Sequence, residues 1–323
     1  MKKFIPHTLT LALVSGLLLP QLAFAAGAPV NEAKNVSANE KIYIENMRGH
    51  VEIKAVKSPA FSVKGTLDEK AEGFDFTSKD GITRFVVKMP RTNFGWGDHS
   101  DKEGSQLVIE VPEGSALEFS GVNSSVSVTG VAGSSKIHTV NGTITAKQLS
   151  NDVELETVNG EIDSIGNSGR VRLNTVNGSI DDEGSSGRVN VESVNGEINL
   201  QSSAKEIEVS VVNGEAELML SGTERLDYSS VNGEIRAAVT NSKAPRINAS
   251  SVSGSSILKL DADVSARFKL VASAGGDINN KITEQKADKA KYGPRRSLEF
   301  STGSGDGSID MSTVSGELRV EKN

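Results

Sequence analysis

One tripeptide, Val-Asn-Gly, recurs through the chain at an almost constant spacing. It occurs six times, and successive copies are 18, 18, 18, 18 and 19 residues apart. Its polar members are Asn141, Asn159, Asn177, Asn195, Asn213 and Asn232, followed by Gly142, Gly160, Gly178, Gly196, Gly214 and Gly233. Val-Ser-Gly continues the series at 252–254 and 314–316. A fixed period of this length is typical of repeat architectures, in which each unit is covered only by its neighbours.

Aliphatic residues flank the tripeptide at fixed offsets. Five residues before the valine stand Val153, Val171, Val189, Ile207, Leu226, Ile247 and Ile309. Leu155, Leu173, Val191 and Val209 are three before it, and Ile144, Ile162, Ile180 and Ile198 are four after it. The positions between them are mostly polar. This period of two predicts half-buried strands, so each unit reads as strand, Asn-Gly corner, strand and turn.

Two architectures fit such units. Asparagine and glycine both tolerate positive φ, so the chain can turn sharply between them, as in an antiparallel hairpin. Stacking of identical Val, Ile and Asn positions at about 4.8 Å instead favours a solenoid, because only a solenoid rewards so close a repeat. The expected fold is therefore all-β, a single-stranded parallel β-solenoid with coils of about 18 residues. An array of hairpins is the alternative.

The regular period does not extend over the whole chain. Residues 26–115 are expected to form an irregular N-terminal β cap region, although Ile42 to Ile53 match the repeat with Met47 in the valine place. Residues 116–323 form the expected repeat domain, with a basic insert at 281–296 before the final coil. Terminal units of repeat proteins are commonly atypical, because they shield the stack from edge pairing.

The first 25 residues resemble a secretory signal peptide. Lys2 and Lys3 precede an apolar run from Leu9 to Leu22, and Ala23-Phe24-Ala25 is a cleavage sequence of the small-x-small type. The chain is therefore expected to be exported, to the periplasm first, with the outer surface or the medium as alternatives. No later segment is apolar enough to span a membrane, so no transmembrane segment is expected in the mature chain.

Composition removes several classes of function. The chain has no cysteine, which excludes disulfides and thiolate metal sites. Its formal net charge of -7 argues against a nucleic-acid partner, because phosphate binding needs a basic face. No nucleotide-binding, hydrolase or zinc motif occurs, and the three histidines beyond the predicted leader lack metal spacing. We therefore expect no cofactor, no metal site and no catalytic residues.

The layout resembles one known family. An N-terminal strand pair at 42–53, the Leu-x-Ile-x-Val-Pro strand at 107–112 and the serial Val-Asn-Gly or Val-Ser-Gly units are similar to a bacterial domain of unknown function called "putative adhesin". The resemblance covers roughly residues 40 to 320. It implies β-strand repeats and, through its name alone, adhesion; it supplies no catalytic residues.

The candidate sites are rows of repeated side chains. The asparagine row is either a polar rail for a ligand or, as we favour, a structural ladder of stacked amides. Glu197, Glu215 and Glu234 follow the glycines and would stack as like charges, each pair at a cost of about 1 kcal/mol in water unless a cation or nearby arginines offset it. Trp96 is either a contact for a partner or the hydrophobic plug of the cap. The basic insert is either a solvated loop or a contact for acidic headgroups.

These features favour a monomeric, non-enzymatic repeat protein of the cell envelope with a structural or adhesin-like binding role. Its ligand, an unknown envelope or surface component, is not encoded in any motif. Two alternatives remain: a β-helix enzyme acting on polysaccharides, which would use the stacked acidic and basic side chains, and a scaffold that assembles end to end.

Overall fold

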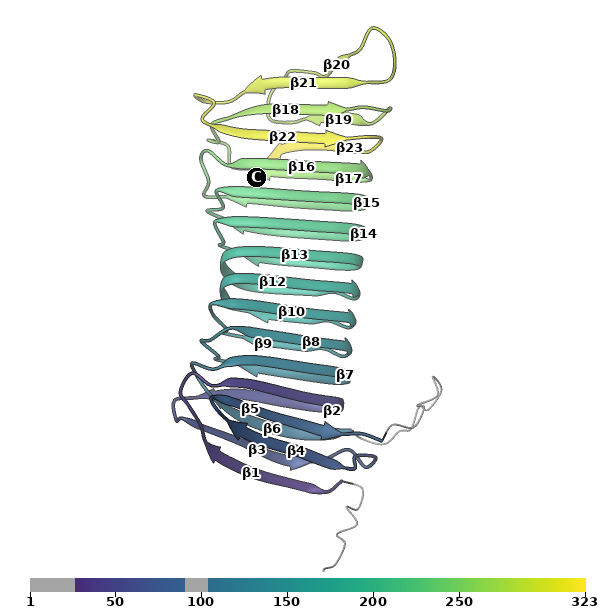
Figure 1. Ribbon diagram of the computed structural model, residues 1–323. Coiled ribbons are helices and arrows are strands. Elements are labelled where there is room, and N and C mark those ends of the chain that lie inside the picture. Colours follow the sequence, from purple (N-terminus) through teal and green to yellow (C-terminus); the bar gives the residue numbers. More distant parts are fainter. Residues whose placement is uncertain (1–26, 91–103) are drawn as a thin grey trace, which may run out of the picture.

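The computed structural model describes residues 27–90 and 104–323; the predicted leader at 1–25 and Trp96 therefore lie outside the described residues. The described chain is all-β, with 23 strands and no helix. Nothing in the described part is a helix of the length and apolar character needed to cross a bilayer. The strands build one elongated stack (Figure 1).

The middle of the stack consists of coils that pair in parallel and in register. Its strands are β7 (Ala116–Thr129), β8 (Ser135–Asn141), β9 (Ile144–Lys147), β10 (Asp152–Asn159), β11 (Ile162–Ile165), β12 (Ser168–Asn177), β13 (Ile180–Ser202), β14 (Glu206–Ser221), β15 (Arg225–Thr240), β16 (Arg246–Ser253) and β17 (Ser255–Leu260). Equivalent repeat positions pair, so Asn159 lies between Asn141 and Asn177, and Ile162 between Ile144 and Ile180. This is a β-solenoid-like stack of coils rather than an array of hairpins.

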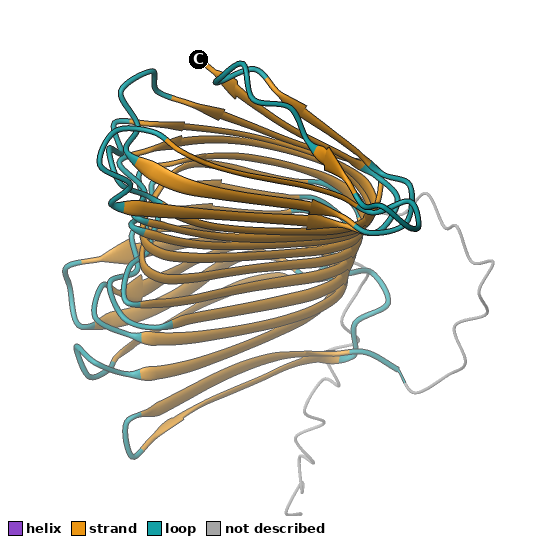
Figure 2. Cartoon of the chain, turned by 90° about the horizontal axis from the view of Figure 1, so that it is seen from above, coloured by secondary structure: helices purple, strands orange, loops and turns teal. Residues whose placement is uncertain are grey.

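Seen along the stack, the strands form two broad layers (Figure 2). The layers meet at a corner where strands such as β14 and β15 continue without a loop, and the Val-Asn-Gly units lie in that bend. The loops between coils gather at the opposite edge. The molecule therefore has two long outer faces, one carrying residues before each valine and one carrying residues after each glycine.

The N-terminal end is built differently. Its strands are β1 (Pro29–Asn35), β2 (Lys41–Val56), β3 (Ala60–Thr66), β4 (Gly73–Lys79), β5 (Ile82–Lys88) and β6 (Ser105–Pro112). Strand β2 is a true coil, since Arg48 pairs with Asn123, which confirms Met47 in the valine place. It is held between β7 on one side and β5 and β6 on the other. Antiparallel pairs β4–β5, β3–β6 and β1–β3 then close this end.

The C-terminal end is also threaded out of sequence order. Its strands are β18 (Ala266–Ala272), β19 (Asp277–Asn280), β20 (Asp288–Lys289), β21 (Arg296–Ser301), β22 (Gly307–Thr313) and β23 (Glu317–Lys322). The last coil, β22 and β23, pairs with β16 and β17 on one side and with β18 and β19 on the other. Antiparallel β21 and the short β20 lie outermost.

The expectation of a wholly parallel solenoid with a cap at one end is therefore corrected. The sheet is mixed, because five antiparallel pairings join the described strands at the two ends. Antiparallel hairpins place an edge of different strand direction and irregular side chains where a parallel coil would otherwise invite another coil to stack. This feature argues against end-to-end assembly.

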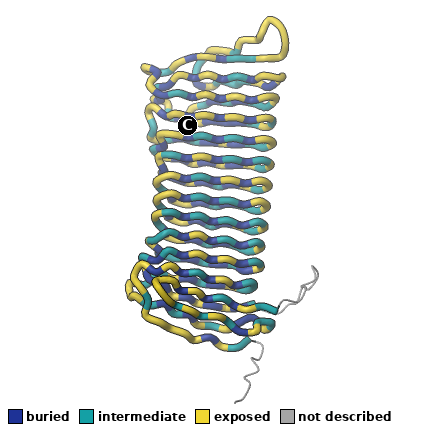
Figure 3. Tube along the Cα trace, viewed as in Figure 1, coloured by how far each residue is buried: buried dark blue, intermediate teal, exposed yellow. Residues whose placement is uncertain are grey.

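The core runs as one continuous aliphatic cluster through the described stack. Buried and exposed residues alternate along the strands (Figure 3). The residues five, three and one before each valine occupy the buried positions, so the valine itself lies on the outer side. Val176, Val194, Val231, Val252 and Val314 are 38–46% exposed, whereas the preceding Thr or Ser is buried. The buried hydroxyl of Thr139 donates to the carbonyl of Ser124 at 2.9 Å, which satisfies backbone at the corner.

Candidate functional site

The asparagine row is a continuous ladder of side-chain amides. Each Nδ2 donates to the Oδ1 of the asparagine one coil earlier, from Asn141 to Asn123 at 2.7 Å through to Asn232 to Asn213 at 3.3 Å. The hydroxyl of Ser253 extends the ladder by donating to Asn232 at 2.6 Å. Each inner amide therefore spends one donor and one acceptor on its neighbours, and its second N–H faces solvent.

The glycines beside this ladder are required by close approach. A Cβ on any of the six would lie 1.8–2.4 Å from the carbonyl oxygen of the residue stacked beneath it. The ladder asparagines do not adopt the positive φ that the sequence pattern favours for them: the described non-glycine residues with positive φ are Asp80, Gln148, Asn151 and Asn241. The corner is thus a bend in extended backbone, which is continuous as a strand in β13, β14 and β15, and glycine is needed for the close approach of one coil to the next.

The acidic row on the second face is in register, as its spacing predicts. Glu215 pairs with Glu197 on one side and with Glu234 on the other. Arg236, two residues along the same face, forms ion pairs with Glu234 and, at 3.9 Å, with Glu215. Arginines that stand six residues before a repeat valine do not offset this row, because they lie on the other face; Arg170, Arg188 and Arg225 pair there with Asp152, Glu206 and Asp227, respectively.

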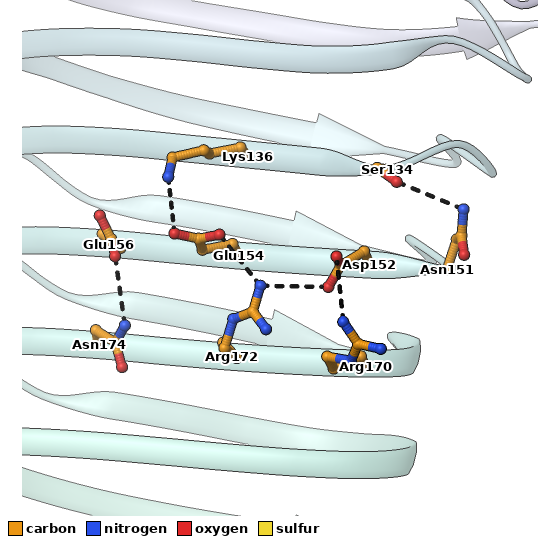
Figure 4. A network of polar contacts seen from close by, with 9 residues as sticks. All are labelled: Ser134, Lys136, Asn151, Asp152, Glu154, Glu156, Arg170, Arg172 and Asn174. Carbon is orange, nitrogen blue, oxygen red and sulfur yellow. Dashed lines mark hydrogen bonds and ion pairs between the residues drawn. The ribbon is translucent and has the colours of Figure 1, made fainter.

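The first face carries a compensated charge network in its N-terminal half (Figure 4). The ammonium of Lys136 donates to Glu154 at 2.9 Å, and Arg172 bridges Glu154 and Asp152 at 3.3 and 3.4 Å. The hydrogen bond from Lys136 is the largest of the effects that hold the pKa of Glu154 below its usual value. This half of the face is therefore occupied by its own ion pairs.

The C-terminal half of the same face is different. A shallow groove of about 580 Å³ lies over β14, β15, β16 and β22, lined by rows of carboxylates and hydroxyls that include Glu208, Asp227, Asp310, Ser210, Ser229 and Ser250. Burial raises the pKa of Asp227, but hydrogen bonds from Asn248 and Arg225 outweigh it, so the pKa lies below its usual value. Glu208 and Asp310 form no ion pair within the described residues, which leaves their charges open to solvent.

A small carboxylate cluster lies on the second face. One oxygen from each of Glu161, Asp163 and Asp181 lies within 4.8 Å of the others. Asp163 accepts a hydrogen bond from Thr145 at 3.2 Å, and Asp181 accepts one from Asn199 at 2.9 Å. Oxygen ligands suit calcium, but that ion takes six to eight of them, so three partly exposed carboxylates do not make a complete protein site.

One carboxyl group points into the core. Asp182 is 4% exposed; its Oδ1 accepts a hydrogen bond from Ser185 at 2.5 Å, while its Oδ2 has no partner. Burial raises the pKa of Asp182 against the lowering effect of its serine hydrogen bonds. The side chain belongs to a buried polar group with Ser164, Asn167 and Ser185 rather than to either outer face.

Replacing Asp182 by asparagine is expected to stabilise the protein at pH 7 by about 1–3 kcal/mol, because an unsatisfied buried charge is removed while the acceptor for Ser185 is kept. Burial raises the pKa of Asp182 in the folded state, so its contribution to the free energy of unfolding is fully present below its unfolded-state pKa and is lost as the pH rises through its folded-state pKa. The parent and Asp182→Asn should therefore have similar stability in acid.

Urea midpoints of the parent and the variant across the pH range measure this difference. The control is Asp181→Asn, at the neighbouring position that faces outward. An Asp182→Asn variant that is less stable than the parent at pH 7 contradicts the prediction.

The structure thus sorts the predicted site residues by face. The asparagine ladder and the glutamate row lie on either side of the glycine corner, the basic insert lies at the C-terminal end, and Trp96 is outside the described residues. The sequence prediction missed the exposed valine row, the groove of carboxylates and serines, and the inward Asp182. The alternation of inward and outward residues in a strand could have revealed the valine row and Asp182. Val176 stands three residues after the inward Leu173 and so faces outward, whereas Asp182 stands two residues after the inward Ile180 and so faces inward.

The chain is similar to one protein family and to several solved structures. No curated protein matches the chain. Solved structures that align with it include a "putative cell adhesion protein" from Clostridium sporogenes, with 12% identity, 91% of this chain and 100% of that chain covered, and a TM-score of 0.21. A "putative lipid binding protein" from Parabacteroides distasonis is 11% identical, with 91% of this chain and 96% of that chain covered and a TM-score of 0.40. A "putative adhesin" from Parabacteroides merdae is 10% identical, with 93% of this chain and 98% of that chain covered and a TM-score of 0.35. A family model described as Toastrack DUF4097 matches residues 39–321.

Proposed function

The chain belongs to the Toastrack DUF4097 family, and on that premise we propose that it is an exported, non-enzymatic rod of the cell envelope. In this proposal the rod resides in the periplasm and binds an envelope or surface component through its long outer faces. The leader-like residues 1–25 support export. The family description names no ligand, so the kind of partner must come from the surfaces themselves.

The observation that carries the proposal is the register of the outward side chains. Ten coils, from β2 to the coil of β22 and β23, repeat the same outward positions at intervals of roughly 4.8 Å. Rows such as Glu197, Glu215 and Glu234 therefore present one chemical group in three successive coils. Repeated weak contacts of this kind add up to firm binding of an extended or repetitive partner without an enclosed pocket.

The described residues also support a role without catalysis. An enzyme site needs groups with shifted pKa values in a cleft, where a base and a nucleophile lie within hydrogen-bond reach. Here the pKa values of Glu154 and Glu321 are lowered by hydrogen bonds from lysines on open faces, and that of Asp227, in the shallow groove, by hydrogen bonds from Asn248 and Arg225. The carboxyl group with a raised pKa, Asp182, is enclosed in the core.

Two measurements test the proposal. Whole cells treated with protease, then fractionated and probed with an antibody, should show a shortened chain outside the cytoplasm; protection until the outer membrane is opened is expected. Purified mature chain should also be retained by isolated envelope fractions, and a Glu197→Gln, Glu215→Gln, Glu234→Gln variant separates the acidic row from the rest of that face. A full-length cytoplasmic chain, or a mature chain that no envelope fraction retains, overturns the proposal.

A further inference from the structure

The C-terminal end of the rod carries a basic loop that the proposed function leaves unexplained. The segment 281–296 follows β19 and ends where β21 begins, in the outermost layer of the stack. It contains six basic and two acidic residues, a net charge of +4 in a chain whose formal net charge is -7. The loop between β20 and β21 projects beyond β21, away from the rest of the rod (Figure 1).

Only the two ends of this segment are held by ion pairs. Lys281 pairs with Glu321 at 3.4 Å, and Arg296 pairs with Asp277. The four basic residues between them are exposed and form no ion pair within the described residues; they are Lys286, Lys289, Lys291 and Arg295. The acidic groups nearest in sequence, Glu284 and Asp288, are too few to neutralise them. The charge of the loop therefore faces solvent.

An exposed aromatic ring lies among these cations. Tyr292 is 83% exposed, the largest exposure among the large apolar side chains of the described residues, and the ammonium of Lys291 lies 5.5 Å from its ring centroid. A tyrosine has an apolar ring and a polar hydroxyl, and so prefers a boundary between water and an apolar phase. Nothing in the described structure covers this ring.

The charge is arranged so that the basic loop favours an anionic surface while the long faces do not. The acidic rows lie on the two long faces. The loop between β20 and β21, which contains Lys291 and Arg295, projects at the end of the stack (Figure 1), and Lys286 and Lys289 come directly before it in the same outermost layer. Screening limits surface electrostatics to about 8 Å at physiological ionic strength. A rod that approaches end-on therefore brings the loop within range of the surface while most of its carboxylates stay beyond it.

We propose that this loop docks the C-terminal end of the rod onto an anionic, phosphate-bearing lipid surface. The lysines and Arg295 contact lipid phosphates, and Tyr292 enters the headgroup boundary. The proposal deepens the proposed function, since an exported rod meets such surfaces in the envelope. Each basic residue near an anionic membrane is worth roughly a five-fold gain in binding.

The test is sedimentation of the purified mature chain with vesicles of phosphatidylglycerol and phosphatidylcholine, compared with phosphatidylcholine alone. Binding to the anionic vesicles only, abolished by about 0.5 M salt, is expected. Lys286→Glu, Lys289→Glu, Lys291→Glu should weaken it by at least roughly 100-fold, and Tyr292→Ala by roughly five-fold. The matched control is Lys41→Glu, Lys57→Glu, Lys64→Glu, which makes the same charge change at the other end of the rod and should bind like the parent.

Three results would overturn the proposal: equal retention on neutral vesicles, equal loss in the control triple, or unchanged binding in the Lys286, Lys289, Lys291 triple with its circular dichroism intact. Displacement by millimolar inorganic phosphate at constant ionic strength would assign the site to free phosphate and would also overturn docking on lipid. A chain found in the cytoplasm would remove the envelope role yet leave vesicle binding as measured, so the two failures are distinguishable.

Discussion

Gly196→Ala is expected to destabilise the protein by about 3 kcal/mol or more, because the new methyl group has no room between coils. A Cβ there would lie 1.8 Å from the carbonyl oxygen of Gly178, which is backbone in the bend between β12 and β13, while Gly196 itself lies in β13 and pairs with Gly214 of β14. Relief requires the coils to separate, which breaks parallel ladder bonds and the asparagine ladder together. The effect is measured as a lowered urea midpoint.

The control is Gly184→Ala, earlier in β13. Gly184 has a φ of +78°, but the nearest atom to its Cβ would be 3.9 Å away, so alanine there meets backbone strain with only ordinary van der Waals contact. About 1 kcal/mol is expected for that strain alone. Gly196 has no positive φ, so the pair separates contact between coils from conformational freedom. Equal losses in the two variants would show that close approach is not the reason for the repeated glycine.

Removal of residues 307–323 is expected to turn a stable chain into one that self-associates. The deleted coil contains Ile309, Met311, Leu318 and Val320, all at most 1% exposed. Its loss uncovers the edges of β16 and β17 together with those of β18 and β19. Unpaired parallel edges above an open apolar core are templates for pairing with another chain.

Light scattering at micromolar concentration distinguishes the outcomes. The control is removal of residues 291–294, which shortens the exposed loop between β20 and β21 and leaves every coil in place. That variant should behave as the parent does. A chain without residues 307–323 that remains a single species with an unchanged melting temperature would mean that the cap closes the stack without the last coil.

The repeat was predictable because stacking makes each coil the template of the next. Identical offsets of Val171, Leu173 and Ile180 in successive units carry both the strand periodicity and the register. The ends were less predictable. The partner of β16 begins 61 residues after Arg246, at Gly307 rather than at Ala266, where β18 begins, and no local pattern states which coil stacks next across an insertion.

In the candidate surfaces, too, residues at repeated offsets could be predicted from the sequence and residues at irregular positions could not. The row of Glu197, Glu215 and Glu234 could be placed because its members occupy one repeated offset. Arg236, which pairs with two of these acids, could not, since the offset it occupies holds Asn199 and Glu217 in the coils before it. Pairing across a face depends on side-chain reach between neighbouring coils, and a single irregular position decides it.

The threading of the last coil sets the order in which the molecule can be completed. A chain is synthesised from its N-terminus, so the coils from β7 to β17 can stack as they emerge. The place between β16 and β18, however, belongs to the final residues, and the far cap has no partner until they arrive. Every newly made molecule therefore passes through a stage in which the edges of β16 and β17 are unpaired. Residues 307–323 end that stage when they pair with these strands.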